Sequence, residues 1–327
     1  MNVLGFIRNW TLPVAIATGI VLYSIFAFVP ALEEASLFFE PLCAWMLPVF
    51  MFLVLYVTFC KVNFHKMKPV RWHLWIGIFQ VFFVLIIVGS ILTFSIKGNN
   101  LILLEAILTC IICPCASACA VVTQKLGGSI EESTSYTFLS NFITAALIPI
   151  CFPMIEKAAG ITFLSSFLTI LKEVVIVLIM PMLCAYITKH YIPALHRKVT
   201  GVKDLAYYLW GGSLVIVSGT TMRNICHADT SVLFLAMVAL LGLVLCLVQF
   251  AVGRYIGHFF DRTVEAGQGL GQKNTAFAIW IASAYLNPLS TVGPGCYILW
   301  QNIINSIEIW RERTKSKSFV SSSEKNV

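Results

Sequence analysis

The chain has 327 residues, of which 59% are hydrophobic and only 11% are charged. Because a soluble domain carries about 25% charged residues, this chain has too little polar surface for a water-exposed globule, and lipid must cover much of it. The composition therefore excludes a soluble globular protein, and the net charge of +7, gathered in a few loops, gives no indication of nucleic-acid binding.

Apolar runs long enough for a membrane-spanning helix recur ten times. A bilayer core needs about 20 apolar residues in a helix, and such runs must be helical because unpaired backbone groups are costly in lipid. No cleavage site follows the first run, so we expect a retained helix rather than a signal peptide. The predicted fold class is an all-α membrane protein, with transmembrane helices at Leu12–Val29, Leu42–Cys60, Leu74–Phe94, Leu101–Val122, Tyr136–Ile155, Phe167–Ile187, Leu205–Met222, Val232–Gly253, Gly271–Leu286 and Cys296–Trp310.

Basic residues predict how the ten helices are oriented, since Lys and Arg accumulate on the cytoplasmic side. One side is sparse and mixed in charge, with Glu33, Glu34, Lys97, Lys157, Arg223 and Asp229. The other side is strongly basic, with Arg8, Lys61, Lys66, Lys68, Arg71, Lys189, Arg197, Lys198, Lys203, Arg254, Arg262, Arg311, Arg313, Lys315 and Lys317. We therefore expect an integral multi-pass protein with both termini cytoplasmic, in a bacterial inner membrane or an organelle membrane of similar descent. Residues 1–314 would form the membrane domain, and the Ser-rich residues 315–327 a disordered tail.

The ten helices divide into two halves of opposite orientation, about 1–158 and 159–314, which is the arrangement of an inverted repeat. Gln80 and Gln249 lie in corresponding third helices of the two halves. The fourth helix is interrupted at Pro114, and the fourth helix of the second half begins with the glycine-rich residues 267–275. Pro114 alone could be a simple kink. The paired breaks predict two discontinuous helices that cross at mid-membrane, with half-helix N-termini that attract anions.

Lys273 lies inside the glycine-rich segment, directly before a strongly apolar run. A charge at membrane depth costs a few kcal/mol or more and usually serves function. If the ninth helix began later, the side chain of Lys273 would instead extend to the cytoplasmic interface. The amides of Gln301 and Asn302 are expected to face a cavity or another helix, because unpaired amides are costly in an apolar environment.

Other polar residues permit more than one interpretation. Ser133, Thr137, Ser140 and Thr144 form a hydroxyl stripe at helical spacing, which suits either hard-cation coordination or helix contact. Glu105 lies near the outer end of the fourth run, where we expect it at the membrane interface. Cys113, Cys115 and Cys119 are not interpreted as a metal site, because no His or second Cys pair at zinc spacing accompanies them.

The sequence contains no nucleophile–base–acid constellation, no P-loop and no helical HExxH motif, so we expect no enzyme activity. A secondary transporter accounts best for the paired breaks. A membrane receptor would be favoured by a sizeable soluble effector domain, which is not visible. A channel usually needs oligomeric symmetry or a charged ring, and the sequence specifies neither a ring nor an oligomeric state.

The chain resembles the bile acid:sodium symporter family. In outline the resemblance covers all ten helices, and it is specific between Pro114 and Pro149, where a proline crossover, a polar stripe and a closing proline keep the family spacing. It is also specific between Gly271 and Ser306, where the family pattern Gly-x-Gln-Asn-Ser, Pro and Trp-His-Asn is followed. The matching residues there are Gly271, Asn274, Thr275, Asn287, Pro288, Pro294, Gly295, Trp300, Gln301 and Asn302.

The resemblance implies a fold with a four-helix panel and a six-helix core, in which helices four and nine cross near two sodium sites. By position, Ser133 and Thr137 match hydroxyl ligands of the first sodium site, and Gln80 matches a side-chain ligand of the second. Four departures alter this cation site. Cys119 and Ala120 stand where the family has Ser and Asn, Gly269 stands where a Glu contributes to both sites, and Lys273 stands where the family has Gln.

These departures lead to a hypothesis about coupling. A sodium ion and an ammonium 4 Å apart repel by about 4 kcal/mol at an effective dielectric of 20. Lys273 is therefore interpreted as a tethered substitute for sodium, with transport sodium-independent or proton-linked through Lys273. A sodium-coupled symporter that uses only the first site is the alternative. No other cofactor or metal is expected, and the expected substrate is a small organic anion, bile-acid-like or a carboxylate, bound by Ser117, Lys273, Asn274, Thr275, Gln301 and Asn302.

Overall fold

The computed structural model describes residues 11–29, 32–63, 66–156, 162–202, 205–228 and 230–324. Within them the regular elements are helices, together with one isolated antiparallel bridge between Cys115 and Lys273. The elements are α2 (Thr11–Phe28), α3 (Glu33–Lys61), α4 (Arg71–Thr93), α5 (Asn99–Ile112), α6 (Cys119–Lys125), α7 (Ile130–Ile155), α8 (Phe163–Val174), η3 (Val175–Ile179), α9 (Met180–Tyr191), α10 (Pro193–Gly201), α11 (Leu205–Cys226), α12 (Val232–His258), α13 (Thr263–Gly271), α14 (Thr275–Tyr285), η4 (Pro288–Thr291) and α15 (Val292–Glu324).

In the part of the chain that the structure describes, five helical stretches are long and apolar enough to cross a membrane: Pro41–Lys61, Arg71–Thr93, Ile130–Ile155, Phe163–Tyr191 and Val232–His258. Shorter apolar helices cover Val14–Phe28, Asn99–Ile112 and Thr275–Tyr285. Many large apolar side chains are exposed on the surfaces of these helices. Examples are Phe82 and Leu85 of α4 and Val232 and Leu233 of α12. Such continuous apolar surface suits lipid rather than water.

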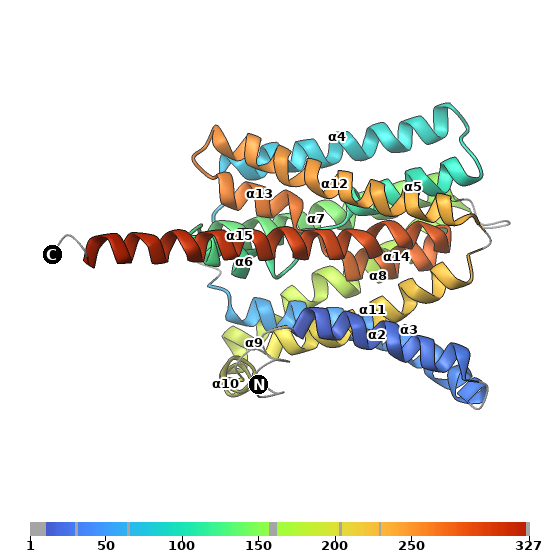
Figure 1. Ribbon diagram of the computed structural model, residues 1–327, viewed down its shortest axis with the longest axis horizontal. Coiled ribbons are helices and arrows are strands. Elements are labelled where there is room, and N and C mark those ends of the chain that lie inside the picture. The colour runs from blue at the N-terminus through green and yellow to red at the C-terminus, as the bar shows by residue number, and fades with distance from the viewer. Residues whose placement is uncertain are drawn as a thin grey trace.

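The helices associate in two groups that lie on different sides of the molecule (Figure 1). In one group α11 packs on α2 and α3, and α9 packs on α3. In the other, α12 packs on α13 and α15, and α4 packs on α5 and α7. Close approach is possible between α12 and α13 because Gly253 has no side chain. A Cβ there would lie 2.5 Å from the carbonyl oxygen of Ala266.

The fourth and ninth apolar runs are each divided into two helices. The fourth is broken over residues 113–118, between α5 and α6. The ninth begins earlier than predicted, because the glycine-rich residues up to Gly271 are already helical in α13 and the break is confined to residues 272–274. Packing against α12 stabilises this glycine-rich helix where local propensity does not.

The end of the chain also departs from the pattern expected from composition. Helix α15 continues to Glu324, through most of the segment predicted as a disordered tail. No proline or glycine follows Gly295, so no residue interrupts the helix. Among the charges used to predict orientation, Arg8, Lys157, Lys203 and Asp229 lie outside the described residues.

Candidate functional site

The two breaks lie directly against each other. The Ala116 N–H donates to the carbonyl oxygen of Gln272 at 2.9 Å, and the Asn274 N–H donates to that of Pro114 at 2.9 Å. Each break supplies the backbone partner that the other lacks, which is how non-helical backbone is tolerated at membrane depth. Segments far apart in the sequence thus form one crossing point.

The last carbonyl groups of α5 have no hydrogen-bond partner within the helix. Three side chains donate hydrogen bonds to them. The Nζ of Lys273 donates to the carbonyl oxygens of Ile111 at 3.0 Å and Cys113 at 3.1 Å. The Nε2 of Gln80 donates to Ile112 at 3.1 Å and Cys113 at 3.3 Å. The hydroxyl of Thr144 donates to Ile112 at 2.8 Å. An ammonium group is favourable there, because the C-terminal end of a helix carries partial negative charge.

Lys273 is only 1% exposed. The interpretation in which its side chain extends to the cytoplasmic interface is therefore wrong. The ninth helix begins at Thr263, well before Lys273, so the residue lies at the crossing and not at a helix entrance. Its backbone is fixed as well, since the Lys273 N–H donates to Gln301 Oε1 at 3.0 Å and Gln301 Nε2 donates to the Lys273 carbonyl at 3.3 Å.

The C-terminal end of α13 likewise receives a side-chain hydrogen bond. The hydroxyl of Tyr297 donates to the carbonyl oxygen of Gly271 at 2.7 Å. Gln249 Nε2 in turn donates to Tyr297 at 3.1 Å and to the carbonyl of Cys110 at 3.2 Å. Gln80 and Gln249, paired in the sequence by their positions in the two halves, therefore both act at the broken helices. Sequence reasoning missed Tyr297, which resembles any other aromatic residue of an apolar run.

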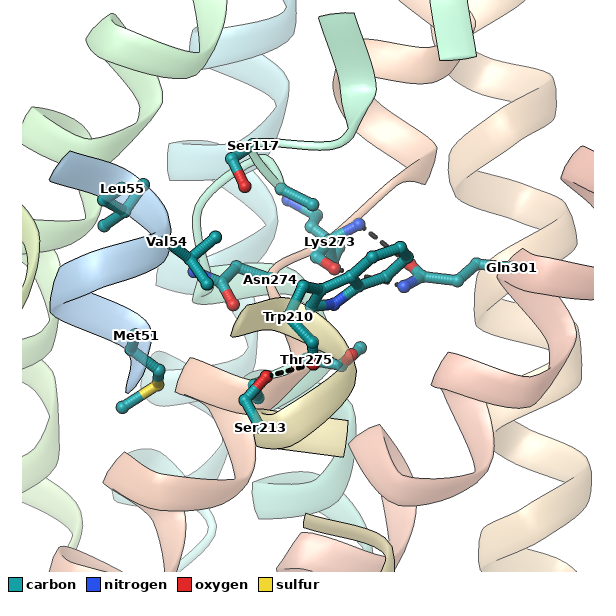
Figure 2. Close-up of a pocket in the computed structure, with 12 residues that line it drawn as sticks. Met51, Val54, Leu55, Ser117, Trp210, Ser213, Lys273, Asn274, Thr275 and Gln301 are labelled. Carbon is teal, nitrogen blue, oxygen red and sulfur yellow. Dashed lines mark hydrogen bonds between the residues drawn. The ribbon is translucent and has the colours of Figure 1, made fainter. Parts of the chain in front are cut away.

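A small cavity of about 20 Å³ lies beside the crossing, and its lining is drawn in Figure 2. A volume of this size holds about one water molecule. The lining combines the crossing segments with residues from α3, α11 and α15: Met51, Val54, Leu55, Ala116, Ser117, Trp210, Ser213, Lys273, Asn274, Thr275, Ala276 and Gln301.

Five of the six predicted substrate residues line this cavity: Ser117, Lys273, Asn274, Thr275 and Gln301. Asn302 does not, because its Nδ2 donates to the Ile298 carbonyl of its own helix at 2.8 Å. Asn274 has a further local role. Its Oδ1 accepts from the Phe277 N–H at 3.3 Å and caps the first turn of α14.

Among the residues matched to the cation site, Gly269 stands where the family has a carboxylate, and a side chain there would be tightly packed against aromatic rings. A Cβ at Gly269 would lie 3.0 Å from Tyr136 Cδ1 and 3.1 Å from Trp72 Cζ3. The Sγ of Cys119 lies 3.9 Å from Thr123 Oγ1. A glutamate at Gly269 would therefore have to displace aromatic rings.

The hydroxyl groups assigned to the first sodium site are differently placed. Thr137 Oγ1 donates to the Ser133 carbonyl of its own helix at 3.0 Å and to Cys115 Sγ at 3.6 Å. Ser133 Oγ is buried without a hydrogen-bond partner among the described residues. Further along the stripe, Ser140 Oγ accepts from the Cys115 N–H at 2.8 Å. The stripe thus supports the broken helix and leaves one hydroxyl, that of Ser133, unpaired.

A larger cavity, of about 480 Å³, lies at the end of the bundle where α7 and α14 end and α8 begins. Its lining is formed by Phe152, Pro153, Glu156, Ser165, Ser166, Thr169, Ile170, Ala284, Tyr285, Leu286 and Asn287.

Comparison with models of known protein families gives a match over much of the chain. Residues 48–255, more than half of the chain, match the model of the Sodium Bile acid symporter family. The matched stretch includes α4 to α11, and with them the first of the two breaks. No curated protein matches the chain.

Proposed function

The chain belongs to the sodium bile acid symporter family, so it is an integral multi-pass membrane transporter of bile-acid-like solutes and not an enzyme. Beyond this, we propose that the ammonium group of Lys273 takes the place of a coupling cation in this transporter. The transported solute is then a small organic anion, and transport proceeds without sodium or with a proton exchanged at Lys273.

The hydrogen bonds of the Lys273 ammonium are the observation that supports this proposal. In transporters with broken helices, the C-terminal ends of half-helices and unwound carbonyls coordinate the coupling ion. Here the ammonium meets such carbonyls, those of Ile111 and Cys113, at 3.0 and 3.1 Å. The tight fit that a side chain would meet at Gly269, between Tyr136 and Trp72, agrees with the loss of a sodium carboxylate ligand.

The proposed architecture has ten transmembrane helices in two inverted repeats, about 1–158 and 159–314, with both termini in the cytoplasm. Helices α2, α3, α8–α9 and α11 would form the panel, and α4 to α7 with α12 to α15 the core. The association of α2, α3, α9 and α11 supports this division, whereas α8 packs on α7 of the core. The breaks at residues 113–118 and 272–274 both lie in the core.

The small cavity must enlarge before it can accept a solute. Sites for organic ligands measure about 300–1,000 Å³, whereas this cavity measures about 20 Å³. Its walls belong to both groups of helices, with Met51 and Trp210 on one side and Ser117 and Lys273 on the other. We propose that α3 and α11 move away from the crossing to admit the anion, which is then held by Ser117, Lys273, Asn274, Thr275 and Gln301.

Uptake by proteoliposomes tests the coupling. The full-length protein is reconstituted, and uptake of taurocholate, a conjugated bile acid, is measured in sodium and in choline, with and without a pH gradient. We expect saturable uptake at equal rates in sodium and choline. A strict sodium requirement would refute the role of Lys273 and favour a symporter that uses the first site, where Ser133 Oγ is unpaired.

The same preparation separates a carrier from other kinds of membrane protein. A carrier loaded with unlabelled taurocholate accelerates the entry of labelled taurocholate, and a channel does not. Binding that stabilises the protein against heat without any uptake would indicate a receptor.

A further inference from the structure

Glu105 is a buried carboxyl group that the proposed transport site does not use. It lies on the second turn of α5 and is 0% exposed. The neighbouring helices and the segment after α14 cover it, so its carboxyl group is enclosed by protein whatever its depth in the membrane. Its Oε2 accepts from the Asn287 N–H at 3.2 Å, and its Oε1 has no hydrogen-bond partner among the described residues.

Glu156, just beyond the end of α7, lines the same cavity as Asn287, whose N–H binds Glu105, so the two carboxyl groups lie close together. Among the described residues, Glu156 is the titratable group that acts on Glu105. Tyr285 at the end of α14 interacts instead with Glu173 of α8, and Lys97, before α5, is exposed. The other titratable groups in the parts of the neighbouring elements near this end are thiols, Cys151 of α7 and Cys296 of α15. Within the described residues, no basic side chain is among the groups that act on the carboxyl of Glu105.

Two facing carboxyl groups without a cation cannot both be charged cheaply when one of them is fully buried. The missing charge balance can come from a metal ion or from a proton. A metal ion would need several oxygen ligands, but Oε2 of Glu105 already faces an N–H donor, and no group of three or more His, Cys, Asp or Glu residues that could hold a metal ion occurs among the described residues. A proton on Oε1 of Glu105, donated to Glu156, satisfies the unpaired oxygen directly.

The surroundings of the pair provide a route for the proton. Glu156 is exposed and lines the cavity of about 480 Å³, together with Asn287. The hydrogen bond from Asn287 joins α5 to the segment after α14, so it links the first half of one broken helix to the last part of the other. Any movement that separates α5 from this segment would expose Glu105 to the cavity.

We propose that Glu105 and Glu156 form a proton-binding site, in which one proton is shared by the two carboxyl groups and released into the cavity when α5 and the segment after α14 separate. Release changes the charge of the pair from −1 to −2. The site would couple proton movement to transport independently of the role proposed for Lys273.

Infrared spectroscopy of the purified full-length protein tests the site without any substrate. In wild type we expect the carbonyl stretch of a protonated carboxyl group near neutral pH, and we expect Glu105→Gln to remove it. Glu156→Gln should change the pH at which this band disappears. Glu131→Gln is the matched control, because Glu131 is an exposed carboxylate at the opposite end of α7 that pairs with Lys66. A band that Glu105→Gln leaves in place, or a titration that Glu156→Gln does not change, would overturn the proposal.

Proteoliposomes test the coupling. A gradient of one pH unit can drive about tenfold accumulation of a solute that moves with one proton. We expect wild type to concentrate taurocholate in response to an inward proton gradient, and Glu105→Gln to equilibrate it without accumulation. Gradient-driven accumulation by Glu105→Gln would refute coupling through this pair. If wild type moved no taurocholate at all, the transport function would fail for this solute, while the infrared result would still decide the proton site.

Discussion

The ammonium of Lys273 donates a hydrogen bond of 3.0 Å to the carbonyl oxygen of Ile111, 162 residues away in the sequence. This bond places a positive charge at the C-terminal end of α5, where the helix dipole is negative. It also joins the break of the second half of the chain to the helix that ends at the first. Movement of either break therefore changes the environment of the charge.

Replacement of Lys273 by Ala should reduce taurocholate uptake to the level of protein-free liposomes, because the variant loses the charge that balances the carbonyls at the crossing. Uptake is measured with the amount of inserted protein determined in the same vesicles. Lys125→Ala is the control, since Lys125 is an exposed lysine on the neighbouring helix α6. Unchanged uptake by Lys273→Ala, at equal insertion, would remove Lys273 from the mechanism.

Gln301 and Asn302 are adjacent amides with different expected contributions. Gln301→Ala removes two hydrogen bonds to the backbone of Lys273 and leaves buried groups unpaired, at a cost of about 1–3 kcal/mol in the free energy of unfolding. Asn302→Ala removes a bond to its own helix and should cost less than about 0.5 kcal/mol. Denaturation of the two variants in detergent measures the difference. Equal losses would contradict the assignment of Gln301 to the crossing.

Gly269→Glu should fail to create a sodium site, although it introduces the carboxylate that the family resemblance expects there. Its side chain would enter space held by the rings of Trp72 and Tyr136, so the variant should lose about 1–3 kcal/mol of stability through overpacking. Thermal unfolding is recorded in sodium and in choline for both the variant and wild type. A sodium-dependent rise in the unfolding temperature of Gly269→Glu would show that a binding site had formed.

Gly253→Ala should weaken the contact between α12 and α13. The added Cβ would lie 2.5 Å from the backbone oxygen of Ala266, which cannot turn aside as a side chain could, so we expect a loss of about 1–3 kcal/mol. Gly89→Ala is the matched control on α4, because a Cβ there meets nothing within 4 Å and alanine favours the helix. The prediction is wrong if the two variants unfold at the same temperature.

The sequence by itself determined the helical class and the places where two helices break. A long apolar run in lipid must form a helix, because its backbone groups have no water to bind. Pro114 interrupts such a helix because it has no N–H to donate to the preceding turn. Because lipid imposes the helix on every apolar run, each of the ten predicted runs is helical over most of its length in the described residues. It also identified Lys273, because an ammonium beside an apolar run is conspicuous without any knowledge of its neighbours.

Only the tertiary structure decided which polar groups meet. The partners of Lys273 are carbonyls more than 150 residues away, and no local period in the sequence encodes that distance. The same holds for Asn302, which turns to its own helix, for Glu105, which is buried by neighbouring elements, and for Gly269, whose space is filled by Trp72 and Tyr136. Hydropathy specifies which segments enter the membrane, whereas burial and hydrogen bonding at the crossing depend on how separate helices pack against one another.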